Sequence, residues 1–248
     1  MGKKAKAGET YFVDLYDAEF SRDAEPANAV TQDHYYYQMA SFIRQYKGAR
    51  RPQAASGKDK IRIDGVFADW AKVKTRFTDD QGDVLHRNHP GWGRIQAYTN
   101  TTGRNDIVAA AVASDAENVY FYVKTAQDMT PRTDPDWMRL FIKVEGQEGP
   151  QWEGFGFHVA PSPQNAQAAS LLRFAGGAWS EGGTVQCRQQ GAEMEIAVPK
   201  KLLGIKGGKF ALQVKWADNF PLGAGAMGWL DKGDAAPNAR FTWRYAHR

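Results

Sequence analysis

From Ile61 onward, the chain is divided into short apolar segments separated by Gly, Pro, Asn and Asp. Such regularly interrupted segments are typical of strands in a sandwich or barrel. The sequence therefore predicts an all-β fold, a two-sheet antiparallel β-sandwich that is jelly-roll-like, with an N-terminal strand and helix extension. The expected strands are Lys60 to Ile63, Ile107 to Ala113, Val119 to Lys124, Met138 to Val144, Gly154 to Ala160, Ala169 to Phe174, Thr184 to Arg188, Glu193 to Val198, Lys209 to Trp216 and Arg240 to Tyr245. One helical turn is expected in VPKKLLGIKGG, after Pro199 and closed by Gly204.

The segment GRNDIVAAAVASDAENVYFYVKT, residues 103 to 125, predicts a hairpin of two central strands. Asp115 and Asn118 suit the turn between them, and the flanking segments are apolar or alternate in polarity. Tyr120 and Tyr122 would then share one face of the sheet. Two explanations remain open for these rings, ordinary packing or a sheet surface that binds a sugar.

Residues 1 to 57 follow a different pattern, and we expect them to form an extension that ends in a linker. DHYYYQMASFIRQYKG spaces its apolar residues three and four positions apart, which predicts an amphipathic helix that Asp33 caps and Gly48 ends. Before it, ETYFVDLYDAEFSRDAEP predicts a strand and an acidic loop. ARRPQAASGKDK is a typical linker sequence, so the sandwich domain is expected to span 58 to 248.

Charge and composition exclude several functional classes. The 32 Lys and Arg and 28 Asp and Glu are spread along the chain, whereas nucleic-acid binders gather basic residues on one face. We expect no membrane partner, because no segment approaches the ~20 apolar residues that span a bilayer. The N-terminal residues do not have the pattern of a signal peptide. The single cysteine, Cys187, is expected to be a buried thiol in a strand.

Several of the eight tryptophans lie in Gly- or Pro-rich connections, where a sugar-binding surface would place them. The C–H face of a pyranose lies flat on an indole ring, while its hydroxyls need polar partners. Trp70 and Trp216 are instead expected in the core. Each loop tryptophan has the alternative role of a core plug. The candidate ligand-binding residues are Trp92, Arg94, Trp137, Gln151, Trp152, Trp179 and Trp229.

The densest polar segment is FTDDQGDVLHRNHPGW. Its oxygen ligands Asp79, Asp80 and Asp83 could hold a structural calcium ion, although the spacing is not that of an EF-hand. His86 and His89 lie in a loop that does not align them for zinc. A solvated loop is the default interpretation. We expect no other cofactor, and no G-x-S-x-G, phosphate-binding or dinucleotide motif occurs.

Five segments stand in the order found in sandwiches like carbohydrate-binding module family 9, which the chain resembles over residues 58 to 248. They are IRIDGVFADWAKV, the hairpin, DWMRLFIKVEG, EMEIAVPKKLLG and FALQVKWADN. Lys143 replaces an acidic residue of that pattern, and Ala239 replaces a glycine. The N-terminal segments EFSRDAEP and YYYQMASFIRQYKG resemble the end of the barrel domain in bacterial proteins similar to glycoside hydrolase families 71 and 99.

These resemblances imply non-catalytic binding of an oligo- or polysaccharide, as the accessory module of a polysaccharide-degrading protein with an upstream glycosidase-type barrel. Such a parent is expected to be extracellular or periplasmic. Catalysis by this chain alone is not expected, because no carboxylate pair stands out as a hydrolytic pair. One alternative is a structural or interaction sandwich that braces a neighbouring domain. A second is a haem-binding redox sandwich with axial ligands among Met129, Met138, Met194 and His158.

Overall fold

A computed structural model describes residues 42–43, 45–48, 59–83, 100–225, 228–238 and 241–247. The chain divides into two units, residues 1–51 with 82–101 and residues 52–81 with 102–248. In the first unit, residues 42–43 and 45–47 are helical, and Gly48 has a φ of 76°, typical of a residue that ends a helix. The strand and loop expected before this helix lie outside the described residues. No described helix has the length and apolar character needed to cross a bilayer.

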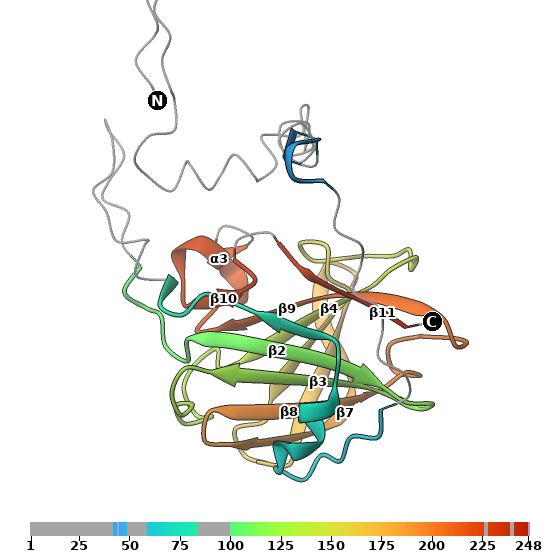
Figure 1. Ribbon diagram of the computed structural model, residues 1–248, viewed down its shortest axis with the longest axis horizontal. Coiled ribbons are helices and arrows are strands. Elements are labelled where there is room, and N and C mark those ends of the chain that lie inside the picture. Colours follow the sequence, from blue (N-terminus) through green and yellow to red (C-terminus); the bar gives the residue numbers. More distant parts are fainter. Residues whose placement is uncertain are drawn as a thin grey trace, which may run out of the picture. The chain divides into compact units, whose positions relative to one another are not determined.

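The second unit is an antiparallel β-sheet (Figure 1). Its described strands are β1 (Arg76–Thr78), β2 (Ile107–Ser114), β3 (Asn118–Thr125), β4 (Arg139–Val144), β5 (Phe157–Pro161), β6 (Ala168–Ala175), β7 (Ala178–Gln190), β8 (Glu193–Pro199), β9 (Phe210–Asp218), β10 (Asp234–Ala236) and β11 (Trp243–His247). The order is β1-β2-β3-β8-β7-β6-β5-β4-β9-β10, and β11 also pairs with β9. Short helical segments are η1 (Phe67–Lys72), η3 (Leu222–Ala224) and α3 (Gly228–Asp231).

The two ends of this sheet meet, so the sheet is nearly closed and barrel-like. The rings of Phe77 on β1 and Trp243 on β11 stack with centroids 5.2 Å apart and planes 8° apart. The N–H of Ile107, where β2 begins, donates to Asp234 Oδ2 on β10 at 2.7 Å. The all-β, antiparallel part of the predicted fold class is therefore confirmed.

Alternation along the strands separates an interior from an outer face. In β4, Leu140, Ile142 and Val144 belong to the interior cluster, and the residues between them point to the outer face. The interior is filled from nearly every strand, with Phe121, Trp216 and other apolar side chains fully buried there. Burial of a large apolar side chain stabilises the fold by roughly 1.5–3 kcal/mol.

The aromatic hairpin is explained by a segment of the same chain that covers it. Tyr120 and Tyr122 lie on the outer face of β3, where the rings of Trp70 and Phe67 lie 5.2 and 6.0 Å from Tyr122. Both hydroxyls have acceptors, Asp115 for Tyr120 and Glu193 for Tyr122. Burial, followed by the bond to Asp115, raises the pKa of Tyr120 to about 12. The rings pack under η1 and its preceding segment.

The strand predicted at Lys60 to Ile63 is wrong. This segment is extended but unpaired in the sheet, and the next N–H groups bond to a side chain instead of a neighbouring strand. Asp64 and Gly65 donate to Glu195 Oε1 at 3.0 and 2.9 Å. Ile61 and Ile63 alternate because one side of this segment is buried against β3 and β8. Burial of one side of an extended segment produces a period of two even where the backbone pairs with no strand.

The helical turn predicted after Pro199 is a short run of hydrogen-bonded turns. The N–H groups of residues 202 to 204 each donate to the carbonyl three residues earlier. Gly204, with a φ of 67°, ends the series as expected.

Candidate functional site on the outer face of the sheet

The outer face of β5, β4 and β9 carries polar and aromatic side chains, whereas the interior face of these strands is apolar. Phe141 on β4 lies opposite His158 on β5 and Lys215 on β9, so the three form one cross-strand row. All three side chains are fully buried, which means that something covers this face of the sheet. A buried histidine and a buried lysine are expensive unless they are bonded, so this row is unusual for a structural surface.

Aromatic side chains from residues 152–155, from β7 and from residues 220–229 gather around Phe141 of this row. We call this group the outer-face aromatic cluster, made of Phe141, Trp152, Phe155, Trp179, Phe220 and Trp229. Trp152 lies 5.6 Å from Trp229 and 6.0 Å from Trp179, centroid to centroid. Trp229 is 2% exposed and stacks on Phe220, so it forms the floor. Trp152 and Trp179 are only half-buried, so their rings are the accessible part of the cluster.

A tight turn fixes the position of Trp152. The N–H of Trp152 donates to the carbonyl of Phe155, and the N–H of Phe155 donates back, at 2.9 and 2.8 Å. Glu153 and Gly154 between them have φ values of 48° and 86°, the left-handed conformation that such a turn requires. The indole is therefore carried on a short hydrogen-bonded hairpin and not on a long loop.

A histidine and an arginine lie beside the accessible rings. His158 contacts the ring of Trp179 edge to face at 4.5 Å, and its Nε2 lies 3.3 Å from Arg139 Nη1. Arg139 also donates to Asp136 at 2.6 Å. Burial, followed by the charge of Arg139, lowers the pKa of His158 to about 3, so the ring is neutral at ordinary pH. Because a guanidinium only donates, Nε2 must accept, and the ring proton lies on Nδ1.

Three N–H groups of this cluster have no acceptor. His158 Nδ1, Arg139 Nε and Trp179 Nε1 are buried, and none has a hydrogen-bond partner in the described part of the chain. An unsatisfied buried donor costs about 1–3 kcal/mol, so native structures rarely contain several together. Unpaired donors beside half-exposed indoles indicate a place where another molecule supplies the acceptors.

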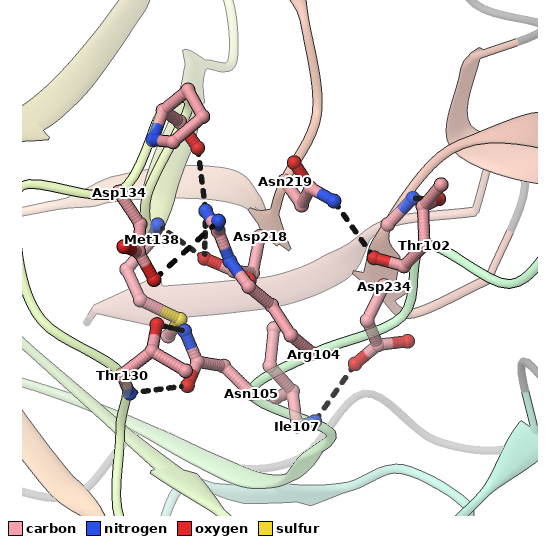
Figure 2. Close-up of polar contacts among 12 residues, drawn as sticks. Thr102, Arg104, Asn105, Ile107, Thr130, Asp134, Met138, Asp218, Asn219 and Asp234 are labelled. Carbon is pink, nitrogen blue, oxygen red and sulfur yellow. Dashed lines mark hydrogen bonds and ion pairs between the residues drawn. The ribbon is translucent and has the colours of Figure 1, made fainter.

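A second polar network lies at one end of the barrel, where residues 102–105 meet the end of β9 (Figure 2). Arg104 Nε donates to Asp218 Oδ2 at 2.7 Å and its Nη2 donates to the carbonyl of Pro135. Asp218 Oδ1 accepts the N–H of Met138 at 2.9 Å. Burial raises the pKa of Asp218, while Arg104 opposes the shift. Both carboxylate oxygens are used, so this network has the character of a structural clasp.

A cleft of about 320 Å³ adjoins the clasp. Its walls include Arg104, Asn105, Asp106, Asp128 and Thr130, and none of the predicted ligand-binding residues lines it. Asn105 is already occupied, because it accepts the N–H of Thr130 and donates to its hydroxyl. Arg104 and Asn105 in its wall are already bonded within the fold.

The chain was compared with family models, with curated proteins and with solved structures. No comparison found a match. The geometry of the chain's own residues therefore carries the functional argument.

The structure brings together three of the predicted ligand-binding residues, Trp152, Trp179 and Trp229. Gln151 is exposed beside Trp152 and lines a pocket of about 40 Å³ with Arg173 and Phe174. Trp137 is not part of this group, because it is 5% exposed in the interior cluster. Trp92 and Arg94 lie outside the described residues.

The metal site predicted at Asp79, Asp80 and Asp83 stays a prediction. Among the described residues, which include these three, no group of three or more His, Cys, Asp or Glu side chains could hold a metal ion.

The candidate haem ligands are also separated. Met138 and Met194 are buried in the interior and Met129 packs against it, whereas His158 contacts the rings of Phe141 and Trp179 on the outer face. The sheet therefore lies between the histidine and the methionines.

Sequence reasoning missed Arg139 and Lys215 as site residues and considered His158 only as a haem ligand. Arg139 could have been found from the alternation of side chains along the strand. Leu140 and Ile142 point to the interior, so Arg139 and Phe141 must point to the outer face. A predicted strand that places a cationic and an aromatic side chain on its outer face indicates a surface that could bind another molecule.

Proposed function

We propose that the outer-face aromatic cluster is a carbohydrate-binding surface, with Trp152 and Trp179 as its platform. The observation that carries the proposal is the combination of two half-buried indoles with unpaired N–H groups of His158, Arg139 and Trp179. An amphipathic ligand with a flat C–H face and a polar rim matches both features.

The contacts that the platform offers suit a pyranose. A sugar ring stacked on an indole buries apolar surface worth roughly 25 cal/mol per Å², a sum like that of another large side chain. Beyond the indoles, Gln151 and Arg173 line the pocket of about 40 Å³, which has room for a ring substituent and its water. Phe174 connects the two places, since its ring lies 5.1 Å from that of Trp179.

The proposal extends to the fold and the setting of the domain. The interior cluster receives side chains from β2, β3, β8 and β7 and also from β4, β5, β6 and β9. We propose that these two groups of strands are the layers of a flattened sandwich of the type found in family 9-like carbohydrate-binding modules. Its role would be that of an accessory module of an extracellular or periplasmic polysaccharide-degrading protein. The ligand is then an oligo- or polysaccharide, and the neighbouring domain is a glycosidase-type barrel.

The test is binding of the whole chain to soluble oligosaccharides by isothermal titration calorimetry, and to polysaccharides by affinity electrophoresis. We expect Trp152→Ala and Trp179→Ala to raise Kd at least tenfold, about 1.4 kcal/mol. Tyr46→Ala is the control, because Tyr46 is an exposed aromatic residue of the other unit. If the folded wild-type chain binds none of the glycans, or if the tryptophan variants bind as it does, the proposal is wrong.

One observation favours the interaction module as a second candidate. Phe42, Ile43 and Tyr46 are 59%, 48% and 89% exposed and lie at helical spacing. Apolar side chains gathered on one face often mark a contact with another domain. Replacing Phe42 and Ile43 by Ser should weaken association with the barrel of the parent protein and leave glycan binding unchanged. Equal association of this variant would eliminate the candidate.

A further inference from the structure

We propose that the group bound beside Trp179 is a carboxylate, so that the ligand of the aromatic cluster is an acidic saccharide containing a uronate residue. This inference rests on the proposed function and specifies its ligand class. It follows from the kinds of hydrogen-bonding atoms that the cluster leaves unused.

All three unused groups are donors. Arg139 Nε and Trp179 Nε1 can only donate, and Nδ1 of His158 carries the proton because Nε2 accepts from Arg139. Two acceptors near them already bond to other atoms of Arg139. They are Nε2 of His158 and Oδ1 of Asp136, which accepts at 2.6 Å. The cluster therefore needs acceptors and has a surplus of donors.

A carboxylate satisfies this need better than a hydroxyl. A hydroxyl that accepts from one of these N–H groups brings an O–H donor of its own, which then needs another acceptor. A carboxylate brings two oxygens with about four acceptor positions and no donor. Charge-assisted bonds to a guanidinium are also shorter and about twice as strong as neutral ones.

Two cations and one carboxylate lie near the accessible rings. Arg139 is paired with Asp136 at 2.6 Å, and Lys215 lies in the same cross-strand row as His158, with Nζ 5.1 Å from the ring centroid of Trp229. Lys215 donates to the carbonyl of Pro237, which holds its ammonium group over that ring. An anion bound at Arg139 therefore feels a second positive charge across the sheet face.

The donors are buried, whereas the rings of Trp152 and Trp179 are half-exposed. A ligand thus reaches the donors only when one of these rings turns aside. Trp179 follows the two-glycine turn of Gly176 and Gly177, which have φ values of 59° and 82°. Ligand binding should consequently change tryptophan fluorescence.

The experiment compares two forms of one glycan on the whole chain, a tetramer of 4-linked galacturonic acid and its methyl ester. The ester keeps the sugar rings and removes the charge. A second pair, xylo-oligosaccharides with and without a glucuronate branch, tests another backbone. We expect each acidic form to bind at least tenfold more tightly than its neutral partner, with a change in tryptophan fluorescence.

Two variants test the donors directly. Trp179→Phe keeps an aromatic ring and removes the indole N–H. His158→Phe likewise keeps an aromatic ring and removes the imidazole N–H. We expect each to weaken binding of the acidic tetramer by about five- to tenfold more than it weakens binding of the methyl ester, so that the preference for the acid falls. The control for unspecific attraction is Lys206→Gln with Lys209→Gln, since both lysines are exposed and belong to neither the row nor the cluster.

Four results would overturn the inference. Equal binding of acid and ester, or binding of neutral glycans alone, would refute it and leave the proposed function intact. If the double lysine variant lost as much affinity for the acidic tetramer as Trp179→Phe, the preference for acidic glycans would be an effect of the protein's net charge and not of these donors. If the folded chain binds no glycan of either kind, the proposed function fails and the inference fails with it.

Discussion

The indole N–H of Trp70 donates a 2.8 Å hydrogen bond to Glu195, a residue 125 positions later in the chain. The other carboxylate oxygen accepts the N–H groups of Asp64 and Gly65. One buried side chain on β8 therefore holds the segment that covers the aromatic hairpin. Two of the segments that gave the family resemblance, IRIDGVFADWAKV and EMEIAVPKKLLG, are joined at this carboxylate.

Removal of this carboxylate should release the covering segment. Glu195→Ala leaves three donors without their acceptor, and we expect the free energy of unfolding to fall by about 3 kcal/mol. Glu195→Gln keeps one acceptor oxygen and should cost less. Guanidinium denaturation measures both, with Glu181→Gln, an exposed residue of β7, as a control expected within about 0.5 kcal/mol. A Glu195→Ala protein as stable as this control would contradict the role.

The pH dependence of stability should reveal His158. Its pKa is lowered by burial, from 6.5 to about 3, so the unfolded chain binds a proton that the folded chain rejects. This contribution to stability is complete above pH 6.5 and is lost as the pH falls toward 3, by up to about 1.4 kcal/mol per pH unit. His158→Phe should remove this slope.

The comparison is cleanest between pH 5 and 7. Glu145, whose pKa is lowered by its bond to Arg244, adds acid sensitivity only below its ordinary value of 4.5. Burial raises the pKa of Glu195 and Asp218, which makes stability fall as the pH rises, and both proteins share this effect. If wild type and His158→Phe lose stability in parallel from pH 7 to 5, the histidine is not neutral in the fold.

The closure of the sheet can be measured through Phe77 and Trp243. Their stacked rings join β1 to β11, and a double-mutant cycle with alanine should give a coupling energy of about 0.5–1.5 kcal/mol. Either single variant should also speed amide hydrogen exchange in β1, because this three-residue edge strand pairs only with β2 among the described strands. Additive losses of stability would mean that the rings touch without holding the edges together.

Gly233 should tolerate no side chain. Its φ is 56°, and an added Cβ would lie 1.8 Å from the carbonyl oxygen of Asp218. Gly233→Ala must therefore displace the backbone at the end of β9, and we expect a loss of more than about 3 kcal/mol. Gly146→Ala is the matched control, because Gly146 has a φ of 79° and open space around it, so only the left-handed backbone costs, about 1–2 kcal/mol. Equal losses would show that the close approach does not matter.

The sequence predicted most strands because their burial alternates or is continuous, as in β2, β3 and β8. It missed β1 and β10, which have three residues each and are too short for any periodicity to appear. The segment Lys60 to Ile63, wrongly predicted as a strand, has the period of two of a strand, but no neighbouring strand pairs with it. Periodicity reports which side of a segment is buried, and the identity of the group that satisfies its N–H groups is a tertiary property.

The candidate site was predictable to a similar degree. Loop composition singled out Trp152, Trp179 and Trp229, but it also singled out Trp137, whose ring lies in the interior under Arg132. Composition alone does not say which loops fold back over the same strand face. The partners of the indoles, Arg139 and His158, lie on strands, and only the register of β4 with β5 brings them together.

The edge of β9 is completed by two short strands and not by one long strand. β10 pairs with Trp216 to Asp218 and β11 pairs with Phe210 to Val214, so the partner strand changes at Lys215. Residues inserted between these two strands would interrupt no ladder of backbone hydrogen bonds. The chain could therefore grow longer after Pro237 without losing a strand pairing, while Pro237 itself must stay in place because its carbonyl accepts from the buried Lys215.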